Sequence, residues 1–439
     1  MSTLSTTQSL SDMLTSNDYQ STTEVCQGCE NRCSVRLFHF QNGNTFFSGN
    51  NCEKIYANTI EGRRKGVNLF DEKYRLLFRR AKIEPLTHDG VQQTIGLPRA
   101  LGMYENFPFW STLLTACGFR VVLSRPSTNA IYASGLRYVM ADNICFPAKM
   151  MHGHIIDLVN RHVDRILYPY VVYERKEDTH SSNSYNCPIV AGYSDVIRSS
   201  MDTQRRYDVP LDAPVITFSD EKLLTDSCCD YLATLGIGRQ TAEQAVGMAR
   251  KAQDDYLNAL THRAMQVLDD AERDGRMVIL LAARPYHIDP LIQHKIADAI
   301  ADMGIDVITE NVASRAGADV YDNINAISQW AYPNRIFKAA YFCGKSTMKH
   351  LHFVELTSFG CGPDAFILDE VAAILNRFGK NLTILKIDDV NNIVHEYAVI
   401  NSIFAEHTRE LGSTVAQIAQ DKSCVIDGTQ KCVYVAQQS

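Results

Sequence analysis

The sequence predicts an α/β protein with two doubly wound parallel-sheet domains. Two observations carry this prediction. Strand-like and helix-like segments alternate with short connections between them, which is the pattern of βαβ units in parallel sheets. The same strand, helix and strand pattern then occurs twice at similar intervals, at residues 94–124 and 277–309. We therefore expect two Rossmann-like domains, with a small cysteine-bearing hairpin module before them and a helical linker and tail.

The length and composition set further limits. The chain has 439 residues, too many for one ordinary core, with 45% hydrophobic and 21% charged residues. A net charge of −7 gives no polyelectrolyte character, so no nucleic-acid partner is expected. No apolar run reaches the roughly 18 residues of a membrane helix. Residues 1–24 are rich in Ser and Thr and lack the pattern of a secretory signal, so we expect a disordered tail and a cytoplasmic protein without membrane contact.

Thirteen cysteines in such a chain favour metal ligation and buried thiols over disulfides, because the cytosol keeps thiols reduced. Four of them lie in residues 25–62, where strand-like residues flank Asn42 and Gly43 in a predicted hairpin. So small a module has no core of its own, and a metal is its natural stabiliser. The spacing leaves zinc, a [4Fe-4S] cluster and a reduced thiol-rich loop all open. The candidate metal ligands are Cys26, Cys29, Cys33 and Cys52.

A basic connector is expected at 63–92, and the first Rossmann-like domain at 93–220. Within that domain an apolar helix at 104–117 ends at Gly118, because glycine readily adopts the left-handed conformation that closes helices. The strands expected there are 94–99, 120–124, 164–170 and 214–218.

Residues 221–275 are expected to form a helical bridge, because apolar residues recur every three or four positions between 241 and 273. The second Rossmann-like domain follows at 276–390, with a helix expected at 290–303. Its expected strands are 277–281, 304–309, 352–356 and 382–387. The tail, 391–439, has a helical pattern at 391–420 and then a possible hairpin at 424–435.

Three more cysteines, Cys145, Cys187 and Cys361, each lie beside proline or glycine. These neighbours stop strands or open helices, so we expect each thiol at a helix N-terminus, where its pKa should fall and the thiolate should be favoured. Ligands of doubly wound sheets bind at the carboxyl ends of strands, where all three can be placed, in a cleft between the domains. Three thiolates suit a [4Fe-4S] cluster with one open iron; three separate structural cysteines are the alternative.

Other candidates surround these thiols in the predicted topology. Arg284, His287 and Asp289 follow the first strand of the second domain, and Glu105 follows the matching strand of the first. His152 and His154 would lie near Cys145, either as a proton relay or as solvated or helix-capping histidines. The catalytic candidates are Glu105, His152, Arg284 and His287. The cysteines expected to pack without a ligand role are Cys117, Cys228, Cys229 and Cys343.

Several longer strings, over roughly residues 24–390, resemble the 2-hydroxyacyl-CoA dehydratase/activase-related family. The strings are GLPRAL at 96–101, YENFPFW at 104–110, CFPAK at 145–149, RPYHIDP at 284–290, YPNRI at 332–336 and SFGCGPD at 358–364. In the family this region usually follows two actin-like ATPase halves, which this sequence lacks. The resemblance therefore implies that ATP hydrolysis comes from a partner or from a part outside this chain.

The resemblance also implies a cofactor and a reaction. Related dehydratase subunits hold a [4Fe-4S] cluster with three cysteines between Rossmann-like domains. An ATP-dependent activator, an actin-like ATPase, supplies single electrons, and water leaves a 2-hydroxyacyl-CoA through a ketyl radical. Carried onto this chain, the ligands would be Cys145, Cys187 and Cys361. The protein would then be an oxygen-sensitive component of anaerobic metabolism, as a homo- or heterodimer.

Three functional hypotheses follow. The first is the dehydratase-like iron–sulfur component acting on a CoA thioester or another small molecule. The second is an ATP-dependent reductase of small molecules, like relatives that carry a double-cubane cluster. The third is a non-catalytic scaffold or regulator with zinc in the N-terminal module.

Overall fold

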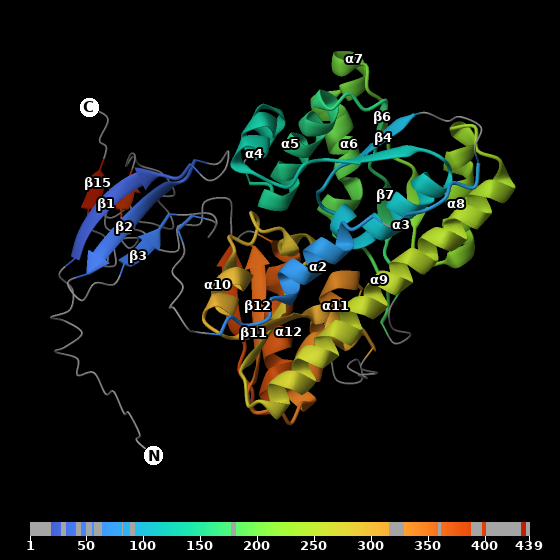
Figure 1. The fold of residues 1–439 in the computed structure, drawn as a ribbon. Coiled ribbons are helices and arrows are strands. Elements are labelled where there is room, and N and C mark those ends of the chain that lie inside the picture. Colours follow the sequence, from blue (N-terminus) through green and yellow to red (C-terminus); the bar gives the residue numbers. More distant parts are fainter. Residues whose placement is uncertain are drawn as a thin grey trace, which may run out of the picture. The chain divides into compact units, whose positions relative to one another are not determined.

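The computed structural model describes most of the chain. The described residues are 19–27, 32–40, 45–49, 55–56, 64–80, 82–87, 93–141, 143–176, 181–315, 329–358, 361–387, 397–400 and 432–435. By their internal contacts the residues form two compact units, Met1–Asp388 and Asp389–Ser439. Figure 1 shows the helices and strands along the chain.

A three-stranded antiparallel sheet lies near the N-terminus. Its strands, in sheet order, are β1 (Tyr19–Val25), β2 (Ser34–Phe40) and β3 (Thr45–Ser48). The pairing of β2 with β3 confirms the predicted hairpin. The expectation of a disordered tail is wrong for residues 19–24, which pair with β2. Their β-branched Thr22 and Thr23 suit a pleated strand, a preference that the polar composition concealed.

A parallel four-stranded sheet forms the first α/β region, which we define as residues 93–235. Its order is β5-β4-β6-β8, and a separate parallel pair joins β7 to β9. The strands are β4 (Thr94–Leu97), β5 (Arg120–Leu123), β6 (Arg165–Leu167), β7 (Tyr170–Tyr173), β8 (Leu211–Asp212) and β9 (Val215–Thr217). The helices are α3 (Met103–Ala116), α4 (Asn129–Gly135), η1 (Leu136–Tyr138), α5 (Phe146–Asn160), α6 (Pro188–Met201), α7 (Thr203–Tyr207) and α8 (Glu221–Thr234).

The second α/β region, residues 276–387, repeats this winding. Its parallel sheet has the order β11-β10-β12-β13, so in both sheets the first strand lies between the second and the third. The strands are β10 (Val278–Ala282), β11 (Asp306–Thr309), β12 (Leu351–Ser358) and β13 (Thr383–Ile387). The helices are η2 (Pro285–Ile288), α10 (Ile296–Asp302), η3 (Glu310–Arg315), α11 (Ala331–Lys345) and α12 (Gly362–Asn376). The predicted α/β class with parallel, Rossmann-like sheets is confirmed; the domain boundaries within residues 93–390 stay a prediction.

The helix expected at 290–303 is shorter than the sequence pattern indicates. Only Ile296–Asp302 is α-helical, because His294 and Lys295 adopt positive φ angles of 50° and 58°. Left-handed backbone cannot continue a right-handed helix. Before this break, the Asp289 carboxylate accepts hydrogen bonds from the backbone N–H groups of Leu291 and Ile292.

Helix α9 (Arg239–Arg273) confirms the predicted bridge between the two regions. It packs against α3 and α8 of the first region and against β11 and η3 of the second. Figure 1 shows this long helix running alongside both regions. Its Gln253 side chain donates to the carbonyl of Glu105 and accepts from the N–H of Phe109. This contact bridges the break in α3 at Asn106, where the backbone leaves the helical conformation.

The basic connector contains helix α2 (Leu69–Leu77), which the sequence analysis did not predict. Asn68 caps it by accepting from the N–H groups of Phe70 and Asp71. Its buried Lys73 pairs with Glu310 of the second region at 2.8 Å.

In the second unit, β14 (Tyr397–Ile400) and β15 (Cys432–Val435) form a parallel pair. The helix expected at 391–420 is therefore wrong for residues 397–400, where the aromatic Tyr397 and the β-branched Val399 and Ile400 also suit a strand. The possible hairpin at 424–435 stays a prediction, because residues 424–428 lie outside the described residues.

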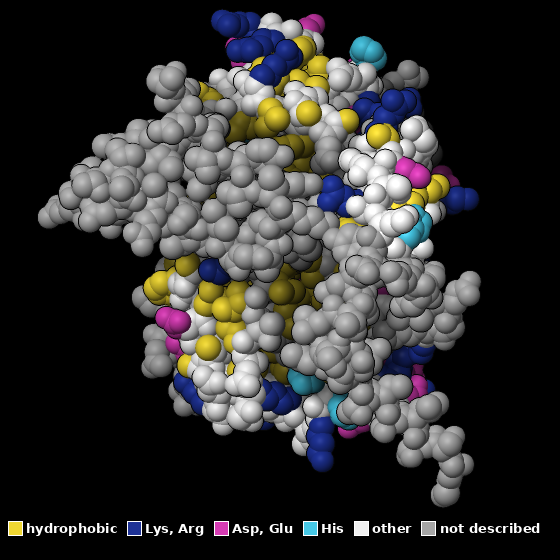
Figure 2. Space-filling view, turned by 90° about the vertical axis from the view of Figure 1, so that its left-hand side faces the viewer, with side chains coloured by type: hydrophobic (Ala, Val, Ile, Leu, Met, Phe, Trp, Pro, Cys, Tyr) yellow, Lys and Arg dark blue, Asp and Glu magenta, His cyan; other side chains and the backbone are white. Residues whose placement is uncertain are grey.

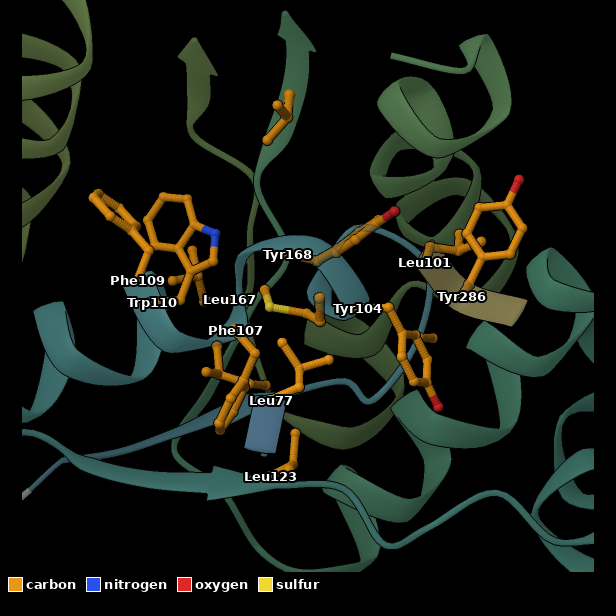
Figure 3. Close-up of a cluster of buried hydrophobic side chains, with 14 of the residues drawn as sticks. Leu77, Leu101, Tyr104, Phe107, Phe109, Trp110, Leu123, Leu167, Tyr168 and Tyr286 are labelled. Atoms are coloured by element: carbon orange, nitrogen blue, oxygen red, sulfur yellow. The ribbon is translucent and has the colours of Figure 1, made fainter. Parts of the chain in front are cut away.

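The buried core runs through both α/β regions. Figure 3 shows Tyr286 of the second region beside Leu101 of the first, in a cluster that also contains Tyr104 and Tyr168. On the face seen in Figure 2, hydrophobic side chains are visible in its upper and lower parts, and Lys and Arg side chains gather at the top. Within the described residues, no helix is long and apolar enough to cross a membrane.

Candidate functional site

Each of the three singled-out cysteines is the N-cap residue of a helix. Cys145 precedes α5, Cys187 precedes α6 and Cys361 precedes α12, and each helix has proline in its first turn. Proline starts helices well because its fixed φ suits the first turn and its missing N–H would have no partner there. The predicted placement at helix N-termini is confirmed, and all three are free, partly exposed cysteines.

The three thiols share one neighbour, Tyr286. Each of them raises the pKa of the buried Tyr286 hydroxyl, whose largest shift comes from burial. The thiols of Cys145, Cys187 and Cys361 therefore lie within electrostatic reach of a single side chain. The expected drop in thiol pKa is wrong for two of them. Burial raises the pKa of Cys145 to about 11 and that of Cys361 to about 12, because it outweighs the helix N-termini.

Arg284 and Asp364 form a buried ion pair at the start of α12. The Arg284 Nε donates to the Asp364 Oδ1 at 2.7 Å, and Nη2 donates to the same oxygen. The Thr357 hydroxyl donates to the other carboxylate oxygen at 2.8 Å. Burial would raise the pKa of Asp364, but Arg284 and His287 hold it below its usual value. The pair fixes the helix turn that follows Cys361.

His287 is fully buried beside this pair. Its Nδ1 accepts from the backbone N–H of Arg284 at 3.3 Å, which leaves the proton on Nε2, 3.2 Å from the Ser358 hydroxyl. Burial lowers the pKa of His287 to about 4, so the ring is neutral at neutral pH. The same region contains Glu355, whose carboxylate oxygens have no hydrogen-bond partner among the described residues. Burial raises the pKa of Glu355 to about 8.

Glu105 joins the two regions. Arg335 of α11 donates to both of its carboxylate oxygens, at 2.7 and 3.1 Å. Burial would raise the pKa of Glu105, but Arg335 lowers it below its usual value. A second carboxylate, Glu174, lies within reach of Glu105, and burial together with the Glu105 charge raises the pKa of Glu174 to about 7.

Asp289 and His154 belong to a buried chain of hydrogen bonds. The His154 Nδ1 lies 2.9 Å from the Ser124 hydroxyl, and its Nε2 lies 3.1 Å from the Ser127 hydroxyl. Ser127 and Tyr104 both donate to one carboxylate oxygen of Asp289. Burial lowers the pKa of His154 to about 3 and raises that of Asp289. This chain excludes the solvated or capping role considered for His154.

His152 is also fully buried, but neither of its ring nitrogens has a hydrogen-bond partner among the described residues. It packs edge-on against Tyr193. Gly153, between the two histidines, allows α4 to pack closely against α5. Any larger residue would clash there, because a Cβ on Gly153 would lie 2.1 Å from the Ile131 carbonyl oxygen. His152 is therefore held by packing, and the solvated alternative considered for it is excluded too.

Of the remaining cysteines, Cys432 lies in β15 and Cys424 lies outside the described residues, and the other eight form two groups. Cys26 and Cys33 are buried in the N-terminal sheet, where the N–H of Cys26 donates to the Cys33 carbonyl at 2.8 Å. Cys29 and Cys52 lie outside the described residues, so the four-cysteine site stays a prediction. The cysteines of the second group are buried in the α/β regions: Cys117, Cys228, Cys229 and Cys343.

No three His, Cys, Asp or Glu side chains in the described ranges are arranged to hold a single metal ion. An apolar groove of about 540 Å³ is lined by residues adjacent in sequence to two of the three cysteines. It is lined by Ile144, which precedes Cys145, and by Pro188, which follows Cys187. Tyr193 also lines the groove. Burial is the main cause of its raised pKa, and the Cys145 thiol is the second.

Arg284, His287, Asp289 and Glu105 were expected after the first strand of each domain, as ligand contacts. In the structure they follow β10 and β4 and lie in buried polar clusters, and their roles stay predictions. The sequence analysis missed Tyr286, Glu174, Asp364 and Arg335. Asp364 lies in the string SFGCGPD and Arg335 in the string YPNRI, so both could have been proposed as ion-pair partners of Arg284 and Glu105. Glu174 lies in a polar stretch that carries no pattern, so no sequence signal pointed to it.

Solved structures give only weak similarities. The C-terminal domain of glucosamine-fructose-6-phosphate aminotransferase from Francisella tularensis matches at 8% identity and a TM-score of 0.17, over 73% of this chain and 86% of that chain. A protein from Actinobacillus succinogenes matches at 8% identity and a TM-score of 0.17, over 79% and 96% of the two chains. TM-scores this low do not establish a common fold.

Among curated proteins, none matches the chain. One family model does match: that of the "CoA enzyme activase uncharacterised domain" (DUF2229), over residues 94–312. This span begins at β4 and ends in η3, so it includes the first α/β region, α9 and the segment from Arg284 to Asp289. It includes two of the three N-cap cysteines, Cys145 and Cys187. The match relates residues 94–312 of this chain to an activase-related family of CoA enzymes.

Proposed function

We propose that this chain is an iron–sulfur component of an activase-dependent enzyme system, in which Cys145, Cys187 and Cys361 hold one [4Fe-4S] cluster. A separate ATP-dependent activator would reduce it, and the substrate would be a CoA thioester or another small molecule. One observation carries the proposal: three N-cap thiols, distant in sequence, are all within electrostatic reach of Tyr286. The family match adds the relation to activases and CoA enzymes.

The donor set fits such a cluster. Three partly exposed thiols stand at helix N-termini, whose partial positive charge stabilises bound anions. The Arg284 guanidinium is within electrostatic reach of Cys187 and Cys361. Thiolates of a cubane bind different irons and so stand farther apart than the ligands of one ion, in keeping with the absence of a single-ion site among the described residues. When bound, a cluster with three thiolates supplies single electrons and an open iron as a Lewis acid.

The residues around the thiols would orient them and hold protons. The pair of Arg284 and Asp364 fixes the first turn of α12, and with it the backbone of Cys361. Neutral His287 keeps a proton on Nε2, beside the Ser358 hydroxyl. Tyr286 stays protonated because burial and the thiols raise its pKa, so its hydroxyl remains a hydrogen-bond donor at the site.

The apolar groove beside Cys145 and Cys187 supports a small substrate with an apolar part. Its volume of about 540 Å³ lies within the ~300–1,000 Å³ of ordinary ligand pockets. Its polar lining residues are Tyr193, Asp195 and Ser199.

Iron and acid-labile sulfide in anaerobically purified protein test the proposal. We expect about four irons per chain, or about eight if the N-terminal cysteines also hold a cluster. Cys145→Ala, Cys187→Ala and Cys361→Ala should each lower the iron content, whereas Cys343→Ala, a buried cysteine in α11, should not.

Two results would overturn this assignment. Iron content that is unchanged in all three variants would exclude these cysteines as ligands. Zinc without iron or sulfide under strict anaerobiosis would instead support a scaffold with a zinc-bound N-terminal module. If iron is present, screening with and without CoA thioesters would separate the dehydratase-like component from the alternative double-cubane-type reductase.

A further inference from the structure

We propose that Glu174 is a positioning residue for Cys187 and that it couples the position of this thiol to the contact between the two α/β regions. The inference rests on the proposed function only in treating Cys187 as a ligand. The contacts that support it are independent of any bound group.

Glu174 is 4% exposed and directly follows β7. Its Oε1 accepts from the Asn186 amide at 2.8 Å and from the Tyr332 hydroxyl at 3.0 Å. Its Oε2 accepts from the Asn106 amide at 3.0 Å. Asn186 and Asn106 belong to the first region, and Tyr332 belongs to α11 of the second. One carboxylate therefore joins side chains from both regions.

Asn186 carries this connection to the thiol. Its Nδ2 donates to Glu174, and its Oδ1 accepts from the backbone N–H of Cys187 at 2.8 Å. Because both ends of the Asn186 amide form hydrogen bonds, its orientation is fixed. The amide in turn holds the backbone N–H of Cys187, the N-cap residue of α6.

The backbone makes a second connection at the same place. The N–H of Tyr185 donates to the Gln329 carbonyl at 2.8 Å, and the N–H of Ala331 donates to the Tyr185 carbonyl at 3.0 Å. Two residues before Cys187, the chain thus pairs with the segment that opens α11. Cys361 differs, because the groups that fix its helix turn, Arg284, Thr357 and Asp364, all belong to its own region.

A shift of α11 away from the first region would therefore remove two supports of Cys187 together: the Tyr332 hydrogen bond and the backbone bridge. The supports of Cys361 would remain. Of Cys187 and Cys361, Cys187 is the thiol whose position reports whether the regions are in contact.

Site-resolved alkylation of the metal-free full-length chain tests this. Iodoacetamide labelling rates of Cys145, Cys187 and Cys361 are measured by peptide mass spectrometry for the wild type, Tyr332→Phe and Tyr256→Phe. Tyr256 is the matched control, because it is buried and its hydroxyl has no partner among the described residues. We expect Tyr332→Phe to raise the Cys187 rate about fivefold relative to the other two thiols, the effect of one lost hydrogen bond of ~1 kcal/mol. Tyr256→Phe should leave the ratios unchanged.

Asn186→Ala gives an independent check. It should raise the Cys187 rate as well, and adding Tyr332→Phe should then have less effect than in the wild type, because both act through one network. Equal changes at all three thiols, or no change at Cys187 in either variant, would overturn the inference. The readout needs no cluster. If the anaerobically purified protein contains no iron but its metal-free chain shows the Cys187 effect, the proposed function fails while this inference stands.

Discussion

Two buried charge clusters beside the thiols each contain one arginine and two carboxylates, but their surroundings differ. The Cys361 cluster consists of Arg284, Asp364 and Glu355, and the Cys187 cluster consists of Arg335, Glu105 and Glu174. In each, the arginine pairs with one carboxylate and lowers its pKa despite burial. The second carboxylate of each cluster has a raised pKa.

The second carboxylates differ in their hydrogen bonds. Glu174 accepts three, from neutral donors, and its pKa rises to about 7. Glu355 has no partner among the described residues, and its pKa rises to about 8. At Glu174 the hydrogen bonds from Asn106 and Tyr332 lower the pKa and so offset part of the effect of burial, whereas no hydrogen bond does so at Glu355 among the described residues. The Cys361 cluster also lies within one region, whereas the Cys187 cluster spans both.

The largest effect is expected from removing an arginine. Arg284→Met leaves Asp364 buried without its counter-charge, so the free energy of unfolding at pH 7 should fall by roughly 3–5 kcal/mol, measured by urea denaturation. The double variant Arg284→Met/Asp364→Leu should recover most of this loss. If the double variant is as unstable as the single one, packing and not charge compensation is the cause.

Glu355→Met should raise the free energy of unfolding, whereas Arg284→Met lowers it. The raised pKa means that the folded chain holds this proton while the unfolded chain loses it, so the wild type loses stability as pH rises from about 4.5 to 8. The variant removes the buried carboxylate, and we expect a gain of roughly 1–3 kcal/mol at pH 8 and less at pH 5. Urea denaturation at both pH values measures it; an unchanged pH slope would contradict the role of Glu355.

Tyr332→Phe should have a smaller effect that also depends on pH. It removes a donor to Glu174, which is mostly ionised at pH 8 and mostly protonated at pH 5. Hydrogen bonds to charged groups contribute more, so we expect a loss of about 2 kcal/mol at pH 8 and about 1 kcal/mol at pH 5. An equal loss at both pH values would show that Glu174 does not change its charge over this range.

The smallest effect is expected at the surface. Arg198 pairs with Asp195 at 3.0 Å on α6, and both side chains are more than half exposed. Arg198→Ala should change the free energy of unfolding by no more than about 0.5 kcal/mol, with further weakening by salt. If Arg198→Ala lowered the free energy of unfolding as much as Arg284→Met, burial would not explain why the Arg284–Asp364 pair contributes more to stability than the Arg198–Asp195 pair.

Short-range patterns in the sequence were enough to predict much of the fold. Proline and glycine beside Cys145, Cys187 and Cys361 predicted their N-cap positions, since these residues act on the backbone next to them. Apolar periodicity predicted α9 and the two βαβ units. The same patterns failed at α10, where the left-handed His294 and Lys295 interrupt a regular apolar repeat.

The electrostatics of the site depend on the tertiary structure. Helix position alone predicted lowered thiol pKa values, but burial reverses the direction at Cys145 and Cys361. Glu105 and Arg335 are 230 residues apart in sequence, and only the packing of α11 against the first region makes them a pair. Sequence by itself determined where several elements begin, such as the helices that follow Cys145, Cys187 and Cys361, because proline and glycine act on the adjacent backbone. Folding decided which charges are buried and compensated, because that depends on neighbours brought together from distant parts of the chain.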